Sequence, residues 1–100
     1  MSYYGKTITN PAQGSLTEID WNGSTGMFAV AGSNFRSQTV TLQHKVGDTW
    51  VNIGTDASFT TSAAILFTTA SSKVRVFTSG SGDPLVAVIE VKTVAENKAY

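Results

Sequence analysis

Residues 38–54 read QTVTLQHKVGDTWVNIG, and this stretch decides the fold. Val40, Leu42 and His44 alternate with more polar residues, a Gly-Asp pair follows, and a second run continues through TWVNI. Alternation with a period of two is typical of a half-buried strand, and two such runs around a Gly-Asp pair predict a β-hairpin. Glycine at the first turn position favours a type II′ turn.

The register of this hairpin follows from its apolar residues. A loop with an even number of residues places Leu42 opposite Ile53 and His44 opposite Val51, which keeps one face apolar. An odd loop would place Leu42 opposite Asn52. Because a slip of one residue moves every side chain of a strand to the other face, the even register is predicted.

Two further hairpins are predicted on either side of the first. Upstream, residues 15–21 form a strand that pairs across a four-residue loop with the next run, so that Trp21 lies opposite Gly26. Downstream, a strand that begins at Lys73 pairs across the loop SGSGDP with a strand that contains Glu90. An ion pair between Lys73 and Glu90 on neighbouring strands supports this second pairing.

The remaining segments complete an all-β chain. Residues 62–70 are compatible with a helix, but their threonine-rich flanks and their β-branched and aromatic residues favour a strand. Seven to eight short strands at regular spacing predict a single antiparallel β-sandwich or a jelly-roll-like barrel. The expected organisation is an extended N-terminal arm over residues 1–14, the sandwich over 15–94 and a short tail over 95–100.

Composition limits the classes of function. A chain of one hundred residues is expected to fold as one domain with a single hydrophobic core. Seven acidic and seven basic side chains give a net charge of zero with no run of either sign, which argues against binding to nucleic acid or to an anionic membrane. Charged residues make up only 14% of the chain, which suits a surface that packs against other proteins.

Targeting and redox signals are also few. The chain contains no cysteine, so neither a disulfide framework nor a thiolate metal site is expected. Residues 1–14 lack the apolar segment of a signal peptide, and no stretch approaches the length of a membrane span. We therefore expect a protein that is made in the cytoplasm and is soluble or assembled there.

A search for catalytic groups finds no enzyme signature. His44 is the sole histidine and is expected at the edge of the core with one hydrogen bond. No nucleophile elbow, EF-hand spacing or phosphate-binding loop occurs, and the carboxylates are scattered over strands and turns. The sequence therefore predicts no catalytic residue, no metal site and no cofactor.

Aromatic and cationic side chains on polar faces are the remaining candidates. The predicted register places Trp50 on the same face as Lys45, where it either covers the edge of the core or contacts another molecule. Arg36 lies in a polar connection and is either solvated or at an interface. The candidate interface residues are Tyr3, Tyr4, Arg36, Trp50, Arg75 and Phe77.

The run TVTLQHKVGDTWVNIGTDASFTTSAAILF, followed by KVRVFTSGSG, resembles a pattern in small virion proteins of tailed bacteriophages. The resemblance covers roughly residues 39–82 and is to capsid decoration, or cement, proteins. It implies a non-enzymatic β-sandwich, often a homotrimer, that is made in the host cytoplasm. Such a protein binds the major capsid protein on the outer surface of the phage head and bridges neighbouring subunits.

Two other functions remain open. A receptor- or glycan-binding module of a virion fibre, spike or tail would use Trp21, Trp50 and the tyrosines to stack on sugar rings. A small hydrolase would depend on His44 or on a pair of carboxylates. The resemblance favours the decoration protein, and it implies no catalytic residues.

Overall fold

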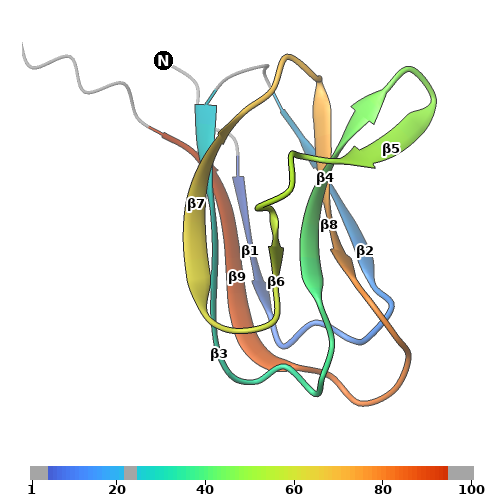
Figure 1. Cartoon of the computed structure of the whole chain (residues 1–100), viewed down its shortest axis with the longest axis vertical. Coiled ribbons are helices and arrows are strands. Elements are labelled where there is room, and N and C mark those ends of the chain that lie inside the picture. Colours follow the sequence, from blue (N-terminus) through green and yellow to red (C-terminus); the bar gives the residue numbers. More distant parts are fainter. Residues whose placement is uncertain (1–4, 22–24, 95–100) are drawn as a thin grey trace, which may run out of the picture.

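The computed structural model describes residues 5–21 and 25–94, and the regular secondary structure of these residues is entirely β-strand. Nine antiparallel strands form two sheets that pack face to face (Figure 1). The strands are β1 Gly5–Thr9, β2 Leu16–Asp20, β3 Thr25–Asn34, β4 Val40–Val46, β5 Thr49–Asn52, β6 Ser58–Phe59, β7 Ala63–Thr68, β8 Lys73–Thr78 and β9 Val86–Thr93. The predicted all-β sandwich is confirmed.

The order of the strands defines the two sheets. The first sheet has the order β1-β9-β3-β7, and the second has the order β2-β8-β4-β5, with the short strand β6 also paired to β4. Within the described ranges there is no helix of the length and hydropathy needed to cross a membrane. The strand predicted within residues 62–70 is β7, as its β-branched and aromatic residues indicated.

The central hairpin has the predicted register. In β4 and β5, His44 pairs with Val51, and the backbone N–H of Ile53 donates to the carbonyl of Leu42 over 3.1 Å. Gly47 has a φ of 62°, as the first central residue of a type II′ turn requires. The end of the hairpin projects from the sandwich (Figure 1), which leaves Val51 42% exposed, so the face that was expected to be buried is partly open.

The other two predicted hairpins are wrong. β2 pairs with β8 and not with β3, while β8 and β9 lie in different sheets. The ion pairs change accordingly, because Lys73 binds Asp20 at 3.1 Å and Glu90 binds Lys92 at 3.3 Å. Alternating strands fit any neighbour that continues the same buried face, so local pattern alone does not choose the partner.

The predicted arm is mostly part of the sandwich. β1 forms the edge of the first sheet by pairing with β9, from Gly5 opposite Lys92 onward. After β1, the backbone N–H of Asn10 donates to the carbonyl of Ala87 over 2.7 Å, and Pro11 is buried. The boundary expected at residue 14 is therefore incorrect, and the tail over 95–100 lies outside the described residues.

The core lies between the sheets and contains two aromatic pairs that join them. Phe28 of the first sheet stacks on Phe59 of the second, with ring centroids 5.0 Å apart. Trp21, which follows β2, lies 5.2 Å from Phe67 of β7. Trp21 also packs against Gly26, so the expected contact exists, although it joins two sheets and not two neighbouring strands. The buried aliphatic residues include Val40, Leu42, Val74, Val76, Leu85, Ile89 and Val91.

Removal of β1 is expected to destabilise the domain. Deletion of residues 1–10 removes the partly buried Ile8, which packs against the core, and unpairs one side of β9. We expect this to lower the free energy of unfolding by about 3 kcal/mol. Urea denaturation followed by circular dichroism measures this loss. Deletion of residues 1–4 is the control because it spares β1, and equal midpoints for the two truncated proteins would contradict the assigned role of β1.

The packing around Gly26 gives a second prediction. A Cβ atom at this position would lie 2.6 Å from Trp21 Cη2 and 2.7 Å from Phe67 Cζ, too close for either buried ring. We expect Gly26→Ala to cost about 1–3 kcal/mol in unfolding free energy. The same substitution should cost less in a Trp21→Phe background, because the smaller ring leaves room. Equal costs in both backgrounds would show that the Trp21 ring is not the obstacle.

Candidate functional site

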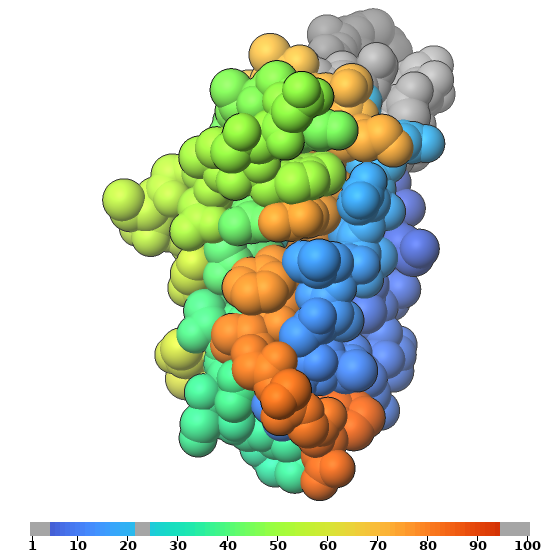
Figure 2. All heavy atoms as spheres, turned by 90° about the vertical axis from the view of Figure 1, so that its right-hand side faces the viewer, coloured from blue at the N-terminus to red at the C-terminus, as the bar shows by residue number. Residues whose placement is uncertain are grey.

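The outer surface of the second sheet is set by the alternation of residues along β8. Val74, Val76 and Thr78 point into the core and are buried, so Arg75 and Phe77 face outward. The strand register places the outward residues of β2, β4, β5 and β6 on the same surface. Figure 2 shows this side of the molecule, with β8 in orange between β2 in blue and the green strands.

We call this surface the ladder face. It consists of the outward side chains Leu16, Glu18, Asp20, Thr41, Gln43, Lys45, Trp50, Asn52, Ser58, Lys73, Arg75 and Phe77.

Hydrogen bonds connect three strands across the middle of the ladder face. Arg75 Nε donates to Gln43 Oε1 over 2.7 Å, and Gln43 Nε2 donates to Asn52 Oδ1 over 2.8 Å. The register explains this chain of bonds, because Gln43 lies opposite both Arg75 and Asn52. The amide of Gln43 therefore links β8 to β5.

Trp50 is the aromatic group of the ladder face. The guanidinium carbon of Arg75 lies 4.6 Å from the centroid of the Trp50 ring, and Lys45 Nζ lies 5.9 Å from it. Both distances allow a cation–π interaction. Trp50 is half-buried, so its indole covers part of the sheet and keeps an exposed part for contact with another molecule.

One end of the ladder face is apolar. Leu16 of β2 pairs with Phe77 of β8, and Leu16 is 54% exposed. Beside them, the hydroxyl groups of Thr41 and Ser58 lie 3.0 Å apart. Leu16 and Phe77 thus form a small apolar area next to the polar ladder.

The end of the ladder face opposite to Leu16 and Phe77 carries an ion pair. Lys73 Nζ lies 3.1 Å from Asp20 Oδ1, and this hydrogen bond together with the charge of Asp20 raises the pKa of Lys73. A raised lysine pKa means that the pair is intact at neutral pH and is lost as the pH rises through that pKa. Both side chains are exposed, so the pair adds little stability.

Four of the six predicted interface residues lie within the described ranges. Trp50, Arg75 and Phe77 share the ladder face, as the preceding geometry shows. Arg36 lies at one end of the sandwich, where its Nε donates to the carbonyl oxygen of Pro84 over 2.6 Å. Tyr3 and Tyr4 lie outside the described residues.

His44 of β4 contacts the connection between β7 and β8 and has no carboxylate partner in the part of the chain that the structure describes. Its Nδ1 lies 2.7 Å from Thr69 Oγ1 and 3.1 Å from Ser71 Oγ, and Ser71 Oγ donates to the carbonyl of Lys45. These bonds attach the connection between β7 and β8 to β4. Over the same described ranges, no group of three or more histidine and carboxylate side chains is arranged to hold a metal ion.

Only one half of the ladder was expected from the sequence. The predicted hairpin paired the strand of Arg75 with the strand that contains Glu90, whereas Arg75 lies opposite Gln43 of β4 and Glu18 of β2. The even register of the central hairpin implies that Gln43 lies opposite Asn52, so this half of the ladder could be predicted from the sequence.

Comparisons with known proteins give one weak structural likeness to report. No family model matches the chain, and no curated protein matches it. Among solved structures, the chain is similar to the crystal structure of the Yersinia pseudotuberculosis-derived mitogen (YPM). The two share 18% sequence identity with a TM-score of 0.49, over 97% of this chain and 87% of the mitogen chain. This degree of likeness carries no inference about function.

The contact between Arg75 and Trp50 can be tested by a double-mutant cycle. We expect Arg75→Ala and Trp50→Ala to be coupled by about 0.5–1 kcal/mol in unfolding free energy, the usual strength of a cation–π pair at an exposed site. Urea denaturation of the two single variants and the double variant measures this coupling. As a control, Arg75→Ala combined with Thr49→Ala should be additive. Additivity of the Arg75 and Trp50 variants would show that the two groups do not interact.

Proposed function

We propose that the protein is a capsid decoration protein of a tailed bacteriophage, which binds the outer surface of the head through the ladder face. The observation that carries this proposal is the grouping of Trp50, Arg75 and Phe77 with the exposed Leu16 on one side of a sheet. Tryptophan and arginine are enriched among the residues that dominate binding energy at protein interfaces.

The resemblance to decoration proteins supports the same surface. It covers roughly residues 39–82, which include β4 to β8. Its TWV segment supplies Trp50, and its VRVF segment supplies Arg75 and Phe77. The segments that carry the resemblance are therefore those that build most of the ladder face.

The chemistry of the ladder face indicates what the partner offers. Arg75 uses Nε for Gln43, and its terminal guanidinium nitrogens have no hydrogen-bond partner among the described residues. Leu16 is exposed beside the half-buried Phe77, and an apolar counterpart would bury both side chains. A capsid surface with a carboxylate or carbonyl oxygen next to an apolar patch would satisfy both needs.

Stabilisation of the shell follows from mass action. A protein that binds only the expanded, assembled shell lowers the free energy of that state by its binding free energy. In a homotrimer, three copies of the ladder face would engage at once, and their combined strength would exceed that of a single contact. The low charge of the chain suits such extensive packing.

A glycan-binding module of a fibre, spike or tail is the alternative, and it rests on Trp50. Trp21 is 3% exposed and belongs to the core, so it is not available to stack on a sugar. At Trp50, a sugar ring would compete with the guanidinium group of Arg75 for the indole face. This competition favours the protein interface over the sugar site.

Copy number distinguishes these functions. Quantitative mass spectrometry of particles purified from the source of the protein should give a ratio to the major shell protein near one, or a simple fraction of it. A handful of copies would indicate a fibre or tail component. Complete absence from particles would rule out a virion protein.

Substitutions on the ladder face test the binding surface itself. We expect Arg75→Glu to reduce attachment to particles that lack the protein by at least about tenfold, because it removes an interface cation and reverses its charge. Co-sedimentation with such particles measures the attachment. Lys92→Glu reverses a charge on the other sheet and serves as the matched control. Equal attachment of the two variants would place the contact elsewhere.

A further inference from the structure

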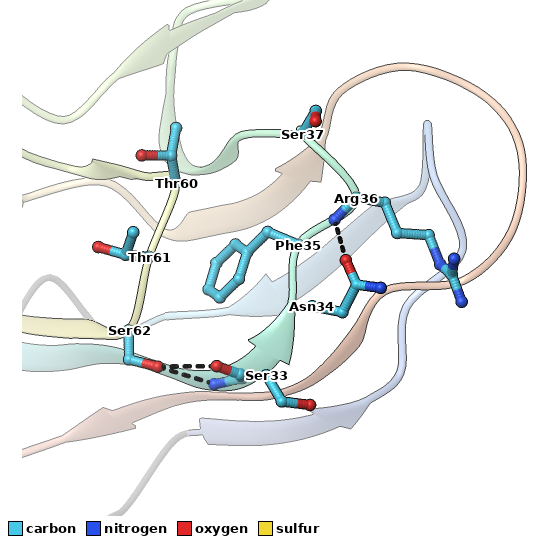
Figure 3. Close-up of a pocket in the computed structure, with 9 residues that line it drawn as sticks. Ser33, Asn34, Phe35, Arg36, Ser37, Thr60, Thr61 and Ser62 are labelled. Carbon is cyan, nitrogen blue, oxygen red and sulfur yellow. Dashed lines mark hydrogen bonds between the residues drawn. The ribbon is translucent and has the colours of Figure 1, made fainter.

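An open hollow lies at the end of the sandwich, away from the ladder face. It is lined by residues 32–37, which lead from β3 toward β4, and by residues 60–62, which connect β6 and β7. Its volume is about 530 Å³, within the range of small-molecule sites. Figure 3 shows Phe35 between the two walls, with its ring pointing toward the wall that carries Thr61.

Hydrogen bonds hold the two walls of the hollow together. Ser62 Oγ accepts a hydrogen bond from the backbone N–H of Gly32 over 2.9 Å and lies 3.2 Å from the carbonyl oxygen of the same residue (Figure 3). Arg36 Nε donates to the carbonyl of Pro84, which fixes the first wall to the loop between β8 and β9. The hollow is thus preformed, and a ligand would not have to order it.

The first wall also contains strained backbone. Arg36 and Ser37 have φ values of 50° and 61°, in the left-handed region that favours glycine and asparagine. They occupy the centre of a tight turn in which the backbone N–H of Gln38 donates to the carbonyl of Phe35 over 2.8 Å. Strain of this kind persists where the surrounding structure imposes it, and it is common at binding sites.

Most of the polar side chains that line the hollow are serines and threonines. Ser33, Ser37, Thr60 and Thr61 are exposed, and their hydroxyl groups have no hydrogen-bond partner among the described residues. A hydroxyl group can both donate and accept a hydrogen bond. No carboxylate lines the hollow, and the guanidinium group of Arg36 points away from the second wall (Figure 3).

We infer that this hollow binds a neutral, polyhydroxylated ligand, that is, a saccharide. Sugar hydroxyl groups donate and accept in the same way as the serine and threonine side chains that line the hollow, whereas Phe35 is only 8% exposed and its ring belongs to the core, so the hydroxyl groups are the main contacts open to a ligand. An anionic ligand would lack a cation that faces it. The inference does not depend on the decoration function, because the hollow and the ladder face are separate and could be occupied together.

Nuclear magnetic resonance of the intact ¹⁵N-labelled protein tests the inference. The probes are the methyl glycosides of glucose, galactose, mannose and N-acetylglucosamine, each at about 50 mM, which reveals binding with a Kd of about 10 mM. We expect at least one probe to shift the amide resonances of residues 32–37 and 60–62. Binding should weaken about fivefold in Thr61→Val, which removes one hydroxyl at nearly constant volume.

Controls keep the outcome decisive. Thr49→Val removes an exposed hydroxyl at the β4–β5 hairpin and should bind as the unaltered protein does. Thr60→Val provides a second variant if Thr61→Val loses its dispersed spectrum. The inference is overturned if no probe shifts the amide resonances of the hollow, if the threonine variants there bind with unchanged affinity, or if inorganic phosphate binds more tightly than every sugar. Shifts confined to Trp50 and its neighbours would instead support the sugar site considered for the ladder face.

Discussion

Burial of every second side chain of β8 is the constraint on which the second sheet depends. Val74, Val76 and Thr78 fill the core beneath β8, and this fixes the outward direction of Arg75 and Phe77. Because β8 has a neighbour on each side, the same alternation sets the orientation of β2 and β4 through their registers. The arrangement of the ladder face is therefore a by-product of core packing and requires no separate device to position it.

The connections between sheets account for the separation of the two candidate surfaces. The chain crosses from one sheet to the other after β1, β2, β3, β6, β7 and β8, and the connections after β1, β3, β6 and β8 lie at the same end of the molecule (Figure 1). Hydrogen bonds between these connections, such as that from Arg36 Nε to the carbonyl oxygen of Pro84, hold this end of the molecule together. Loops carried on a rigid sandwich are common places for binding sites. Sheet faces remain free for broader contacts with another protein.

The sequence predicted features that depend on neighbouring residues. The β4–β5 register followed from alternation and a two-residue turn. The contact of Trp21 with Gly26 was expected from a hairpin that does not form, and it arises from packing between the two sheets. Partner choice between distant strands was missed, because β2 presents the same alternation to β3 as it does to β8. The ladder was therefore only half foreseen, and the hollow was not foreseen at all. Residues 32–37 and 60–62 have no shared motif and meet only through the fold.

The pairing of β1 with β9 has a consequence for chain connectivity. Gly5 lies opposite Lys92, so the described chain begins and ends in adjacent strands of one sheet. A circular permutant in which the two ends are joined and the backbone is opened at the β4–β5 turn would retain the same hydrogen-bonded neighbours for each strand. The fold is thus defined by which strands are neighbours in each sheet, and it does not depend on the order in which the chain visits them.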